Sequence, residues 1–525
     1  MSKSETAATI SGPPLGLGHA HTSVLVGLDA HPISVEVCCT RGPSFFQMVG
    51  LPEAAVREAR VRVASALAGI GVLLDEYAIT VNLAPADLRK AGAALDLPLA
   101  VAVLEAVRAI PAGSLSGTLL LGELGLNGEV RPVRGVLPQV DAARARGMAE
   151  VIVPAQNGRE AGHVLEISVR VARTLGEVVD FCSGKATLKS AERAAFLAED
   201  PEESCGDLAD VRGQAGAKRG LEIAAAGGHN LLMIGSPGSG KTLLARLLPT
   251  ITAPLSLNEA LDVTKIHSVA GLLESEQGIV RRRPFRAPHH SVSEAGLIGG
   301  GDVPRPGEVS LAHRGVLFLD ELTEFRRTAL EALRLPLEDG VVCIARVRAR
   351  ACFPCRPVVV GAANPCPCGY LGHPKRACRC STKSIDAYRS RLSGPIIDRL
   401  DVHLSVPPVD PRALTSKASA ESSRSVRARV AQARERQRLR AEYHQLDCVT
   451  NAHLSLQALE QVAPLDSESR RLIECAMTEL GLSARAYVKV LRVARTIADL
   501  EEEPHVRAPH LAEAIQGRLL DHRQF

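Results

Sequence analysis

The sequence predicts a multidomain protein with an N-terminal α+β domain, a central doubly wound α/β domain and a C-terminal helical domain. The 525 residues exceed what one hydrophobic core usually supports, so about three domains are expected. Apolar runs without alternation, typical of a buried parallel sheet, fall in the middle of the chain, and helical spacing dominates after Pro407. We place the domains at 1–185, 211–407 and 408–525, with a linker rich in Glu, Ala and Ser at 186–210.

The composition is that of a globular protein, with 46% hydrophobic and 23% charged residues. A net charge of +4 is small, so any nucleic-acid role depends on local basic patches. No stretch approaches the roughly 18 uncharged apolar residues of a membrane span. We therefore expect a soluble, cytoplasmic protein without a membrane partner. Its 13 cysteines should be reduced thiols there, and a tight cluster of them favours a metal site over disulfides.

The N-terminal domain is expected to combine short strands with one long helix. Apolar runs at 23–26, 33–37 and 77–83 predict strands, and the spacing over 53–69 predicts a helix.

In the central domain, the runs at 231–234, 316–319 and 358–360 predict parallel strands. The C-terminal domain is expected to contain helices over 425–443, 467–480, 483–500 and 509–520, with Ser467 and Ser483 as helix caps.

A phosphate-binding loop is predicted between the first central strand and the helix 243–248. Binding a triphosphate requires successive backbone N–H groups, a helix N-terminus behind them and a cation over the phosphates. Lys241 supplies the cation and Thr242 a ligand for Mg²⁺. The alternative is a chance glycine-rich turn. The expected nucleotide-binding residues are Gly235, Ser236, Pro237, Gly238, Ser239, Gly240, Lys241 and Thr242.

Two carboxylates follow the next buried strand. Phosphoryl transfer requires a group that holds Mg²⁺ and another that activates water, at the end of an adjacent strand. We assign the first role to Asp320 and the second to Glu321, because four apolar residues precede them. An Asp-Glu pair can otherwise be a helix cap or a solvated face.

These features resemble the AAA+ family, in particular the branch of magnesium chelatase motor subunits and YifB/ComM proteins. The most discriminating segments are 285–291 (FRAPHHS), 306–315 (PGEVSLAHRG) and 364–369 (NPCPCG), and the resemblance to YifB/ComM covers nearly the whole chain. The resemblance implies an ATP hydrolase that uses ATP and Mg²⁺.

The resemblance also implies roles for further residues. Asn364 corresponds to the sensor that orients the lytic water, although a strand-end Asn can also cap a turn. Arg399 corresponds to an arginine finger that acts on a neighbouring subunit, which implies a homo-oligomeric ring, most simply a hexamer. Arg485 resembles the second sensor arginine, and Val211 and Gln214 resemble the adenine-side segment.

A cysteine cluster follows the sensor position. Two C-x-C pairs with nine residues between them can close a tetrahedral Zn²⁺ site, and the polar loop between them needs such a staple. The alternative is four free thiols. The expected ligands are Cys366, Cys368, Cys378 and Cys380, with Cys352 and Cys355 as nearby substitutes or ordinary strand residues.

Two arginine-rich segments are candidate DNA contacts. Alternation between Val341 and Pro357 predicts a β-hairpin bearing Arg346, Arg348 and Arg350, and in the resembled family a hairpin here projects into the ring pore. Such arginines would contact a nucleic-acid backbone without reading sequence, although a solvated basic turn is the alternative. The arginines of the helix 425–443 form either a second phosphate-contacting surface or a solvated face.

The segments 90–100 and 121–133 resemble a Lon-protease-type domain of ribosomal S5 domain 2-like fold. A Ser-Lys dyad would need a serine in the first segment and a lysine beyond the second. The first has Ala93 and Ala94 instead, and the second continues through 135–139 without lysine. We therefore expect this domain to bind or to act as a scaffold.

Taken together, the resemblance and the arginine-rich hairpin favour an ATP-driven DNA motor of helicase or branch-migration type. It would act on branched or single-stranded DNA during recombination of incoming DNA in natural transformation. The alternative is a chelatase-like motor that remodels a protein partner, but the Lon-like domain and the C-x-C pairs are not expected there. An ATP-dependent peptidase is disfavoured by the absent dyad.

Overall fold

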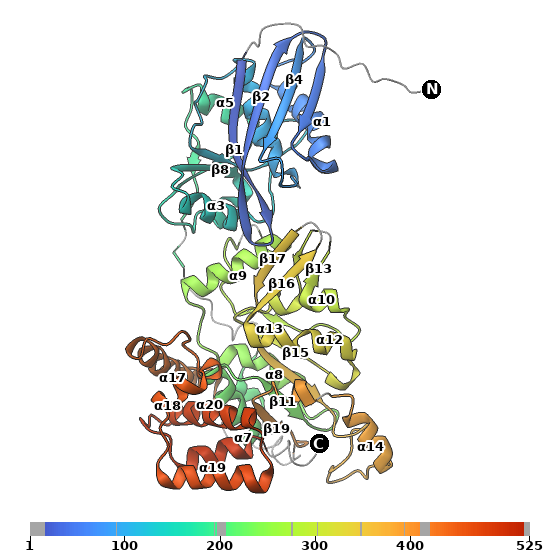
Figure 1. The fold of residues 1–525 in the computed structure, drawn as a ribbon, viewed down its shortest axis with the longest axis vertical. Helices are drawn as coiled ribbons and strands as arrows, with labels where there is room; N and C mark the ends of the chain where they lie inside the picture. The colour runs from blue at the N-terminus through green and yellow to red at the C-terminus, as the bar shows by residue number, and fades with distance from the viewer. Residues whose placement is uncertain are drawn as a thin grey trace.

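The protein is elongated, as seen in a computed structural model that describes residues 16–90, 92–193, 195–196, 206–274, 277–301, 303–346, 349–392, 394–409 and 420–518. The N-terminal domain forms one end of the long axis, and the α/β domain with the C-terminal helices forms the other (Figure 1). Among the helices that the structure describes, none combines the length and apolar character needed to cross a membrane.

The N-terminal domain is built on an eight-stranded mixed sheet of order β10-β9-β8-β5-β1-β2-β4-β3. Its longest pair is the antiparallel hairpin of β1 (Gly16–Val26) and β2 (Asp29–Arg41), in which alternate side chains of β2 are buried. The other strands are β3 (Phe45–Val49), β4 (Tyr77–Ala84), β5 (Thr118–Leu120), β8 (Glu150–Pro154), β9 (Ser168–Ala172) and β10 (Lys189–Ser190), with a separate pair β6 (Glu123–Leu124) and β7 (Val130–Arg131).

Helices pack on both faces of this sheet. The apolar helix α2 (Asp96–Ala106) lies directly on β1, where a Cβ atom at Gly18 would be 1.9 Å from the carbonyl oxygen of Ala102. Its first residue, Asp96, is buried and its carboxylate accepts from Arg62 Nε at 2.6 Å. The remaining helices are α1 (Ala54–Gly69), α3 (Val136–Ala145), α4 (Gly158–Ala161) and α5 (Leu175–Cys182).

The expected linker 186–210 begins inside the N-terminal sheet. Within it, β10 pairs antiparallel with β9, so the domain continues past residue 185. At the other end, Leu208 is buried and its backbone N–H donates to Ser423 Oγ at 2.8 Å. Hydrogen bonds therefore attach β10 and Leu208 to the domains on either side of this segment.

The central domain contains a five-stranded parallel sheet of order β12-β15-β18-β11-β19. The three predicted strands appear as β11 (Leu231–Ile234), β15 (Val316–Leu319) and β18 (Val358–Ala363), all neighbours in the sheet. Because they are parallel, the residues that follow them meet at one edge. The outer strands are β12 (Phe285–Arg286) and β19 (Val402–Ser405).

Helices surround this sheet. The helix predicted over 243–248 is α8 (Lys241–Ile251), which begins directly after the glycine-rich loop. The others are α7 (Ala215–Gly227), α9 (Leu257–Ala270), α10 (Glu294–Ile298), α11 (Glu308–Leu311), α12 (Arg327–Ala332), α13 (Arg334–Asp339), α14 (Thr382–Arg389) and α15 (Gly394–Ile397).

The predicted hairpin is present as β16 (Val341–Arg346) and β17 (Ala349–Pro354), near a smaller hairpin of β13 (Gly299–Gly300) and β14 (Arg305–Pro306). Its turn residues Val347 and Arg348 lie outside the described residues. Cys343 and Cys352, which face each other across the two strands, form a disulfide. This differs from the expectation that all thiols are reduced, because strand pairing brings the two sulfurs together.

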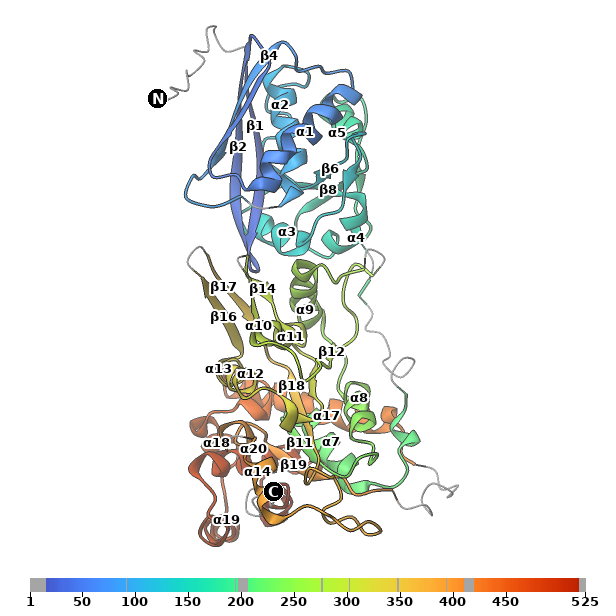
Figure 2. The ribbon, with the colours of Figure 1, turned by 90° about the vertical axis from the view of Figure 1, so that its right-hand side faces the viewer.

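The hairpin reaches the N-terminal domain. The turn between β1 and β2 extends toward β16 and β17 (Figure 2). A Cβ atom at Gly27 would lie 2.7 Å from Ala351 Cβ, and Val26 and Leu28 pack against the apolar cluster that contains Phe353. The two domains therefore touch at this hairpin.

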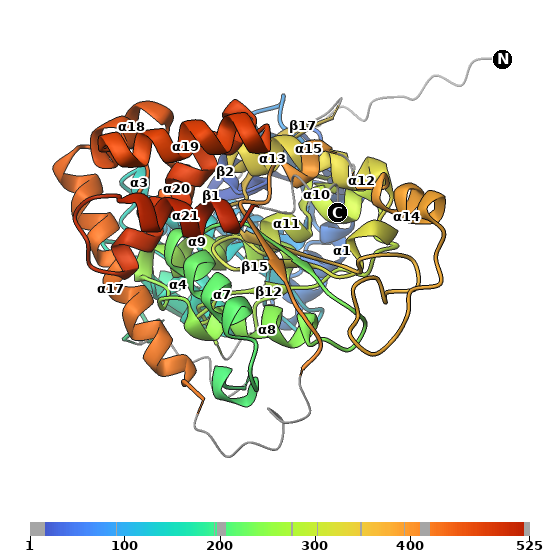
Figure 3. The same cartoon turned by 90° about the horizontal axis from the view of Figure 1, so that it is seen from below.

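The C-terminal helices lie on one side of the α/β domain, opposite α14 (Figure 3). They are α17 (Ser423–Tyr443), α18 (Leu456–Val462), α19 (Ser467–Leu480), α20 (Ala484–Leu500) and α21 (Ala508–Gln516). Ser483 caps α20 as expected, whereas the cap of α19 is Asp466 rather than Ser467, because the Asp466 carboxylate accepts from the backbone N–H of Ser469.

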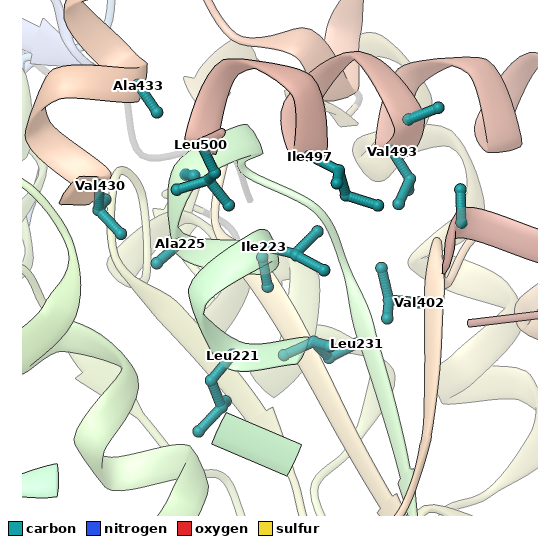
Figure 4. Close-up of a cluster of buried hydrophobic side chains, with 14 of the residues drawn as sticks. Leu221, Ile223, Ala225, Leu231, Val402, Val430, Ala433, Val493, Ile497 and Leu500 are labelled. Atoms are coloured by element: carbon teal, nitrogen blue, oxygen red, sulfur yellow. The ribbon is translucent and has the colours of Figure 1, made fainter. Parts of the chain in front are cut away.

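These helices share a core with the sheet. Side chains of α7, β11 and β19 meet those of α17 and α20 in one buried cluster (Figure 4). Leu231, Val430 and Ile497, from three different elements, are each fully buried in it. These C-terminal helices, which we call the lid, are therefore packed against the α/β domain and share its core.

Several arginines of α17 have partners in other elements, whereas Arg424 and Arg438 are exposed. Arg434 is half-buried and donates to the carbonyl oxygen of Ala225, and Arg440 pairs with Asp499 at 2.6 Å. Arg429 pairs with Glu222, also at 2.6 Å. One face of α17 is buried, and Arg429, Arg434 and Arg440 bind residues of α7 and α20. For the exposed arginines, a phosphate-contacting surface and a solvated face both stay predictions.

Candidate functional site

The loop from Gly235 to Gly240 joins β11 to α8 and leaves backbone N–H groups at the start of the helix. Gly238 and Gly240 adopt positive φ angles of 75° and 89°, which glycine tolerates best. At Gly235, a Cβ atom would lie 2.2 Å from the carbonyl oxygen of Val406, so a larger residue does not fit. The glycines thus permit the tight loop that an anion needs for close approach to the backbone.

Lys241 lies across this loop. Its Nζ donates to the carbonyl oxygens of Gly235 at 2.7 Å and Ser236 at 3.1 Å, and to Asn364 Oδ1 at 3.2 Å. Burial lowers the pKa of Lys241, and the carboxylates of Asp320 and Glu321 partly oppose that shift. The ammonium group is therefore held at the loop and beside the end of β18.

The two carboxylates occupy the end of β15, opposite the loop. Thr242 Oγ1 donates to Asp320 Oδ2 at 2.9 Å, and the backbone N–H of Glu321 donates to Asp320 Oδ1 at 2.9 Å. A hydroxyl and a carboxylate at this separation are the hard oxygen donors that Mg²⁺ prefers. Thr242 and Asp320 therefore fit a magnesium ion, and the exposed Glu321 side chain lines the same cavity.

One residue beside Glu321 was not predicted as part of the site. His290 Nδ1 lies 3.4 Å from Glu321 Oε2, and its ring stacks on His289 with centroids 4.0 Å apart. The sequence indicates His290 only as part of the segment 285–291, which carries the family resemblance. Glu321 itself has a positive φ of 51°, a strained conformation for a non-glycine residue.

A cavity of about 390 Å³ collects most of the predicted residues. It is lined by Pro237, Gly238, Ser239, Gly240, Lys241, Thr242, Asp320, Glu321, Ala362, Ala363 and Asn364. Asn364 reaches it because the carboxyl ends of β11, β15 and β18 lie side by side.

The two expected adenine-side residues differ from each other. Gln214 Nε2 donates to the carbonyl oxygens of Ser239 at 2.7 Å and Pro407 at 3.1 Å, so it braces the phosphate loop. Val211 is buried in the apolar core and is absent from the described lining of the cavity.

Arg399 and Arg485 lie together in another place. Both line a cavity of about 550 Å³, with Glu338, Lys489 and Arg492, and neither is among the described residues that line the phosphate-loop cavity. Arg399 pairs with Glu338, and its Nε donates to the carbonyl oxygen of Arg334 at 3.3 Å. Burial lowers the pKa of Arg399, and the charges of Arg334 and Arg485 lower it further. Arg399 is buried and Arg485 is exposed, so the chain holds two basic side chains of different accessibility at a site separate from its own loop.

The four expected zinc ligands converge. The Sγ atoms of Cys366, Cys368, Cys378 and Cys380 all lie within 4.8 Å of one another. Cys352 is bound to Cys343, and Cys355 is buried with its thiol donating to the carbonyl oxygen of Pro336, so neither joins the cluster.

In the N-terminal domain, the described residues contain no Ser-Lys pair at the two Lon-like segments. Ala93 and Ala94 form a 3-10 turn before α2, and Lys90 is buried with its Nζ donating to the carbonyl oxygen of Pro85. The segment where the lysine was expected forms the start of α3 and contacts the central domain: Gly135 N–H donates to the carbonyl oxygen of Ser268 at 3.3 Å.

Comparisons with known proteins match nearly the entire chain. The family model "Magnesium chelatase, subunit ChlI" matches residues 207–414, "Subunit ChlI of Mg-chelatase" matches 35–157, and "Magnesium chelatase, subunit ChlI C-terminal" matches 420–518. The YifB protein of Salmonella typhimurium is 43% identical over 511 residues, which cover 97% of this chain and 98% of that protein.

Two further relatives extend this picture. The competence protein ComM of Haemophilus influenzae is 41% identical over 514 residues, covering 96% of this chain and 98% of ComM. Lon protease 2 of Bacillus subtilis is 29% identical over 119 residues, covering 22% of this chain and 21% of the protease.

Proposed function

Because the chain belongs to the YifB/ComM family of magnesium chelatase-like AAA+ proteins, we propose that it is an ATP-driven motor that acts on DNA. The observation that carries the ATPase part is the convergence of the phosphate loop, two carboxylates and Asn364 on one cavity. This arrangement of residues supplies what phosphoryl transfer needs: backbone groups that bind the phosphates, a metal site and a group that acts on water.

Each residue has a distinct part in the proposed reaction. Backbone N–H groups of the loop and the Lys241 ammonium bind the phosphates. Thr242 and Asp320 would hold Mg²⁺, which neutralises phosphate charge when bound. Glu321 orients and polarises the attacking water, and Asn364 positions it from the neighbouring strand. His290, 3.4 Å from Glu321, fixes the orientation of that carboxylate.

The basic cavity that contains Arg399 and Arg485 supports hydrolysis at an interface between copies of the chain. These side chains are separate from the phosphate loop of their own chain, so they would reach the nucleotide bound to a neighbour. A closed ring, most simply a hexamer, satisfies every such interface. Positive charge from the neighbour would stabilise the charge of the transition state.

The β16–β17 hairpin is the proposed DNA contact. Arg350 is exposed on β17, and the hairpin projects from the sheet toward the N-terminal domain. Contacts of this kind neutralise backbone phosphates and carry no sequence information. Similarity to the competence protein ComM supports a role in competence, in which branched or single-stranded intermediates of incoming DNA are recombined.

The N-terminal domain would serve as a scaffold and not as a peptidase, although part of the chain is similar to Lon protease 2. Its α3 packs on α9 of the central domain, where Lys265 Nζ donates to Asp141 Oδ2 at 2.6 Å. The segment in which a Lon-type dyad would carry its lysine therefore attaches the N-terminal domain to the central domain.

The test is to measure ATP hydrolysis by the full chain with no DNA, with linear duplex and with a four-way junction, and to measure DNA binding across a salt series. The proposal predicts that DNA stimulates hydrolysis, that the junction binds more tightly than the duplex, and that affinity falls steeply with salt. Hydrolysis that no DNA stimulates would contradict it.

A chelatase-like motor that remodels a protein partner is the second candidate, because the matching family models describe magnesium chelatase subunits. It would be favoured if the chain hydrolysed ATP, ignored every DNA and was stimulated by a protein partner. The two candidates share the ATPase site and differ only in what the motor acts on.

A further inference from the structure

The four clustered cysteines have the spacing of a metal-thiolate centre. The Sγ atom of Cys366 lies 3.4 Å from that of Cys368 and 3.6 Å from that of Cys378, and Cys368 and Cys378 are also 3.6 Å apart. A tetrahedron with Zn–S bonds of about 2.3 Å has sulfur–sulfur edges of about 3.8 Å. Disulfide sulfurs, by contrast, are bonded at about 2.05 Å. The cluster therefore matches the metal geometry and not a pair of disulfides.

The composition of the loop between the two cysteine pairs gives a reason why a metal ion would be needed to hold its ends together. The nine residues between the two pairs contain polar, charged, glycine and proline residues and no regular helix or strand. Cys366 is buried and the other three thiols are partly exposed, so the loop has one anchored side and one solvent side. Without a metal, little apolar surface would hold the two ends of such a loop together.

We propose that Cys366, Cys368, Cys378 and Cys380 bind one structural Zn²⁺ ion, and that this centre positions the sensor loop of the ATPase site. Four thiolates complete the tetrahedral coordination of zinc, so the ion has no open position for chemistry. Its role is to hold the chain in place.

The cluster touches the nucleotide site in two places. Cys366 is two residues after Asn364, whose side chain accepts from Lys241 Nζ. Gly369 lies against the phosphate loop, because a Cβ atom there would be 2.4 Å from Pro237 Cδ. A cysteine loop that loses its anchor would displace Asn364, whereas the backbone amides and Lys241 belong to the loop between β11 and α8 and would stay in place.

The second cysteine pair connects to the carboxylates through α14. Ser381, directly after Cys380, caps this helix. Near the end of α14, the Tyr388 hydroxyl accepts from Thr323 Oγ1 at 2.8 Å, in the 3-10 turn that follows β15. Thr323 is two residues after Glu321. The zinc centre would thus fix Asn364 directly and the Glu321 segment through α14.

The first experiment measures metal on the full-length protein, purified without chelator and with its thiols reduced. Elemental analysis should find about one zinc per chain. Exchange for Co²⁺ should give the visible absorption bands of a tetrahedral thiolate centre. Cys366→Ser and Cys378→Ser should lose the metal and these bands, whereas Cys475→Ser, at an exposed thiol on α19, should keep both. This measurement needs neither ATP nor DNA, so its result is independent of the proposed function.

If Cys378→Ser and the wild type contained equal amounts of zinc, the proposed zinc site would be contradicted. Iron in place of zinc would contradict it as well. Since a cysteine variant could fail to fold, the Co²⁺ spectrum of the unsubstituted protein is a second readout. No charge-transfer bands in that spectrum would contradict four thiolate ligands.

The positioning role has its own readout. Zinc-depleted protein should bind ATP with unchanged affinity within about threefold but hydrolyse it roughly 10- to 100-fold more slowly, because a misplaced sensor affects the transition state more than binding. Adding Zn²⁺ back should restore the rate. Loss of zinc with an unchanged rate would refute the positioning role and leave the metal site intact.

Discussion

Lys241 and Glu321 carry separate parts of the proposed reaction, although both line one cavity. The lysine holds phosphate charge in the ground state as well as in the transition state. The glutamate acts on water and contributes only when bonds are changing. Substitutions at the two positions should therefore give different kinetic results.

We predict that Glu321→Gln binds ATP with nearly normal affinity and hydrolyses it about 10²- to 10⁴-fold more slowly. Lys241→Ala should lose both nucleotide binding and hydrolysis. Equilibrium binding of a fluorescent ATP analogue and steady-state phosphate release distinguish the two. Glu324→Gln is the matched control, because this carboxylate forms a surface pair with Arg391 at 3.1 Å. A Glu321→Gln protein as active as Glu324→Gln would contradict the assignment.

The residues of this site differ in how far sequence alone could identify them. The phosphate loop and the Asp320-Glu321 pair follow apolar runs, so local sequence indicates both their type and their location. His290 lies 31 positions before Glu321 and approaches it only because β12 and β15 are parallel neighbours. The partners of the α17 arginines are also distant in sequence: Arg434 bonds to Ala225, 209 positions away. Such contacts depend on the tertiary fold and have no local signal.

At the scale of elements, an ion pair fixes the lid to the sheet. Asp401, just before β19, accepts from Lys489 of α20 at 2.8 Å, and both side chains are largely buried. Burial alone would raise the pKa of Asp401, but Lys489 and His229 outweigh it and hold that pKa well below its usual range. The carboxylate is therefore ionised in the folded protein.

We predict that Asp401→Asn destabilises the protein by about 3 kcal/mol at pH 7, because Lys489 is left buried without its counter-ion. The folded-state pKa of Asp401 lies below the unfolded-state value of about 4. Its contribution is thus complete above about pH 4 and declines as the pH falls below that value.

Urea unfolding followed by circular dichroism should show the difference between wild type and Asp401→Asn narrowing from pH 7 to pH 3. Asp447→Asn, an exposed aspartate of the same region, should change the free energy of unfolding little at either pH. A difference for Asp401→Asn that is the same at both pH values would show that the carboxylate is not held ionised by this pair.

The proposed role of the β16–β17 hairpin predicts how DNA binding depends on the charge of Arg350. Arg350→Ala should weaken binding to all DNA sequences alike and reduce the slope of log affinity against log salt by about one unit, because one phosphate contact is lost. Arg327→Ala, an equally exposed arginine on α12, is the control and should leave the slope unchanged. Equal effects of the two substitutions would argue against the hairpin as the DNA contact.

The sequence predicted the regular elements more accurately than their ends and connections. The strands of the central sheet were found because their apolar runs are continuous, whereas β12, with two residues, is too short for any periodicity. The expected linker contains β10, since a two-residue strand with exposed side chains has no apolar signal. The disulfide joins Cys343 and Cys352 because of the hairpin register, which composition does not reveal.

At the scale of the whole molecule, the proposed reaction would be divided between two cavities that belong to neighbouring chains. The phosphate loop lies in one, and Arg399 and Arg485 lie in the other. Their separation within the chain follows from the fold: Arg399 precedes β19, at the start of the strand, whereas the phosphate loop follows the end of β11. Parallel neighbours place these positions at opposite edges of the sheet. In the proposed reaction, a chain on its own would lack the positive charge that the arginines of its neighbour supply.

The most direct test of this account mixes two inactive proteins, Lys241→Ala and Arg399→Ala, and measures DNA-stimulated ATP hydrolysis after subunit exchange. In a mixed ring, an intact loop on the Arg399→Ala chain faces an intact arginine on the Lys241→Ala chain. We predict that each protein alone is inactive and that the mixture regains a substantial part of the wild-type rate. A mixture that stays inactive although mixed rings are demonstrated, or an Arg399→Ala protein that is fully active alone, would contradict the account.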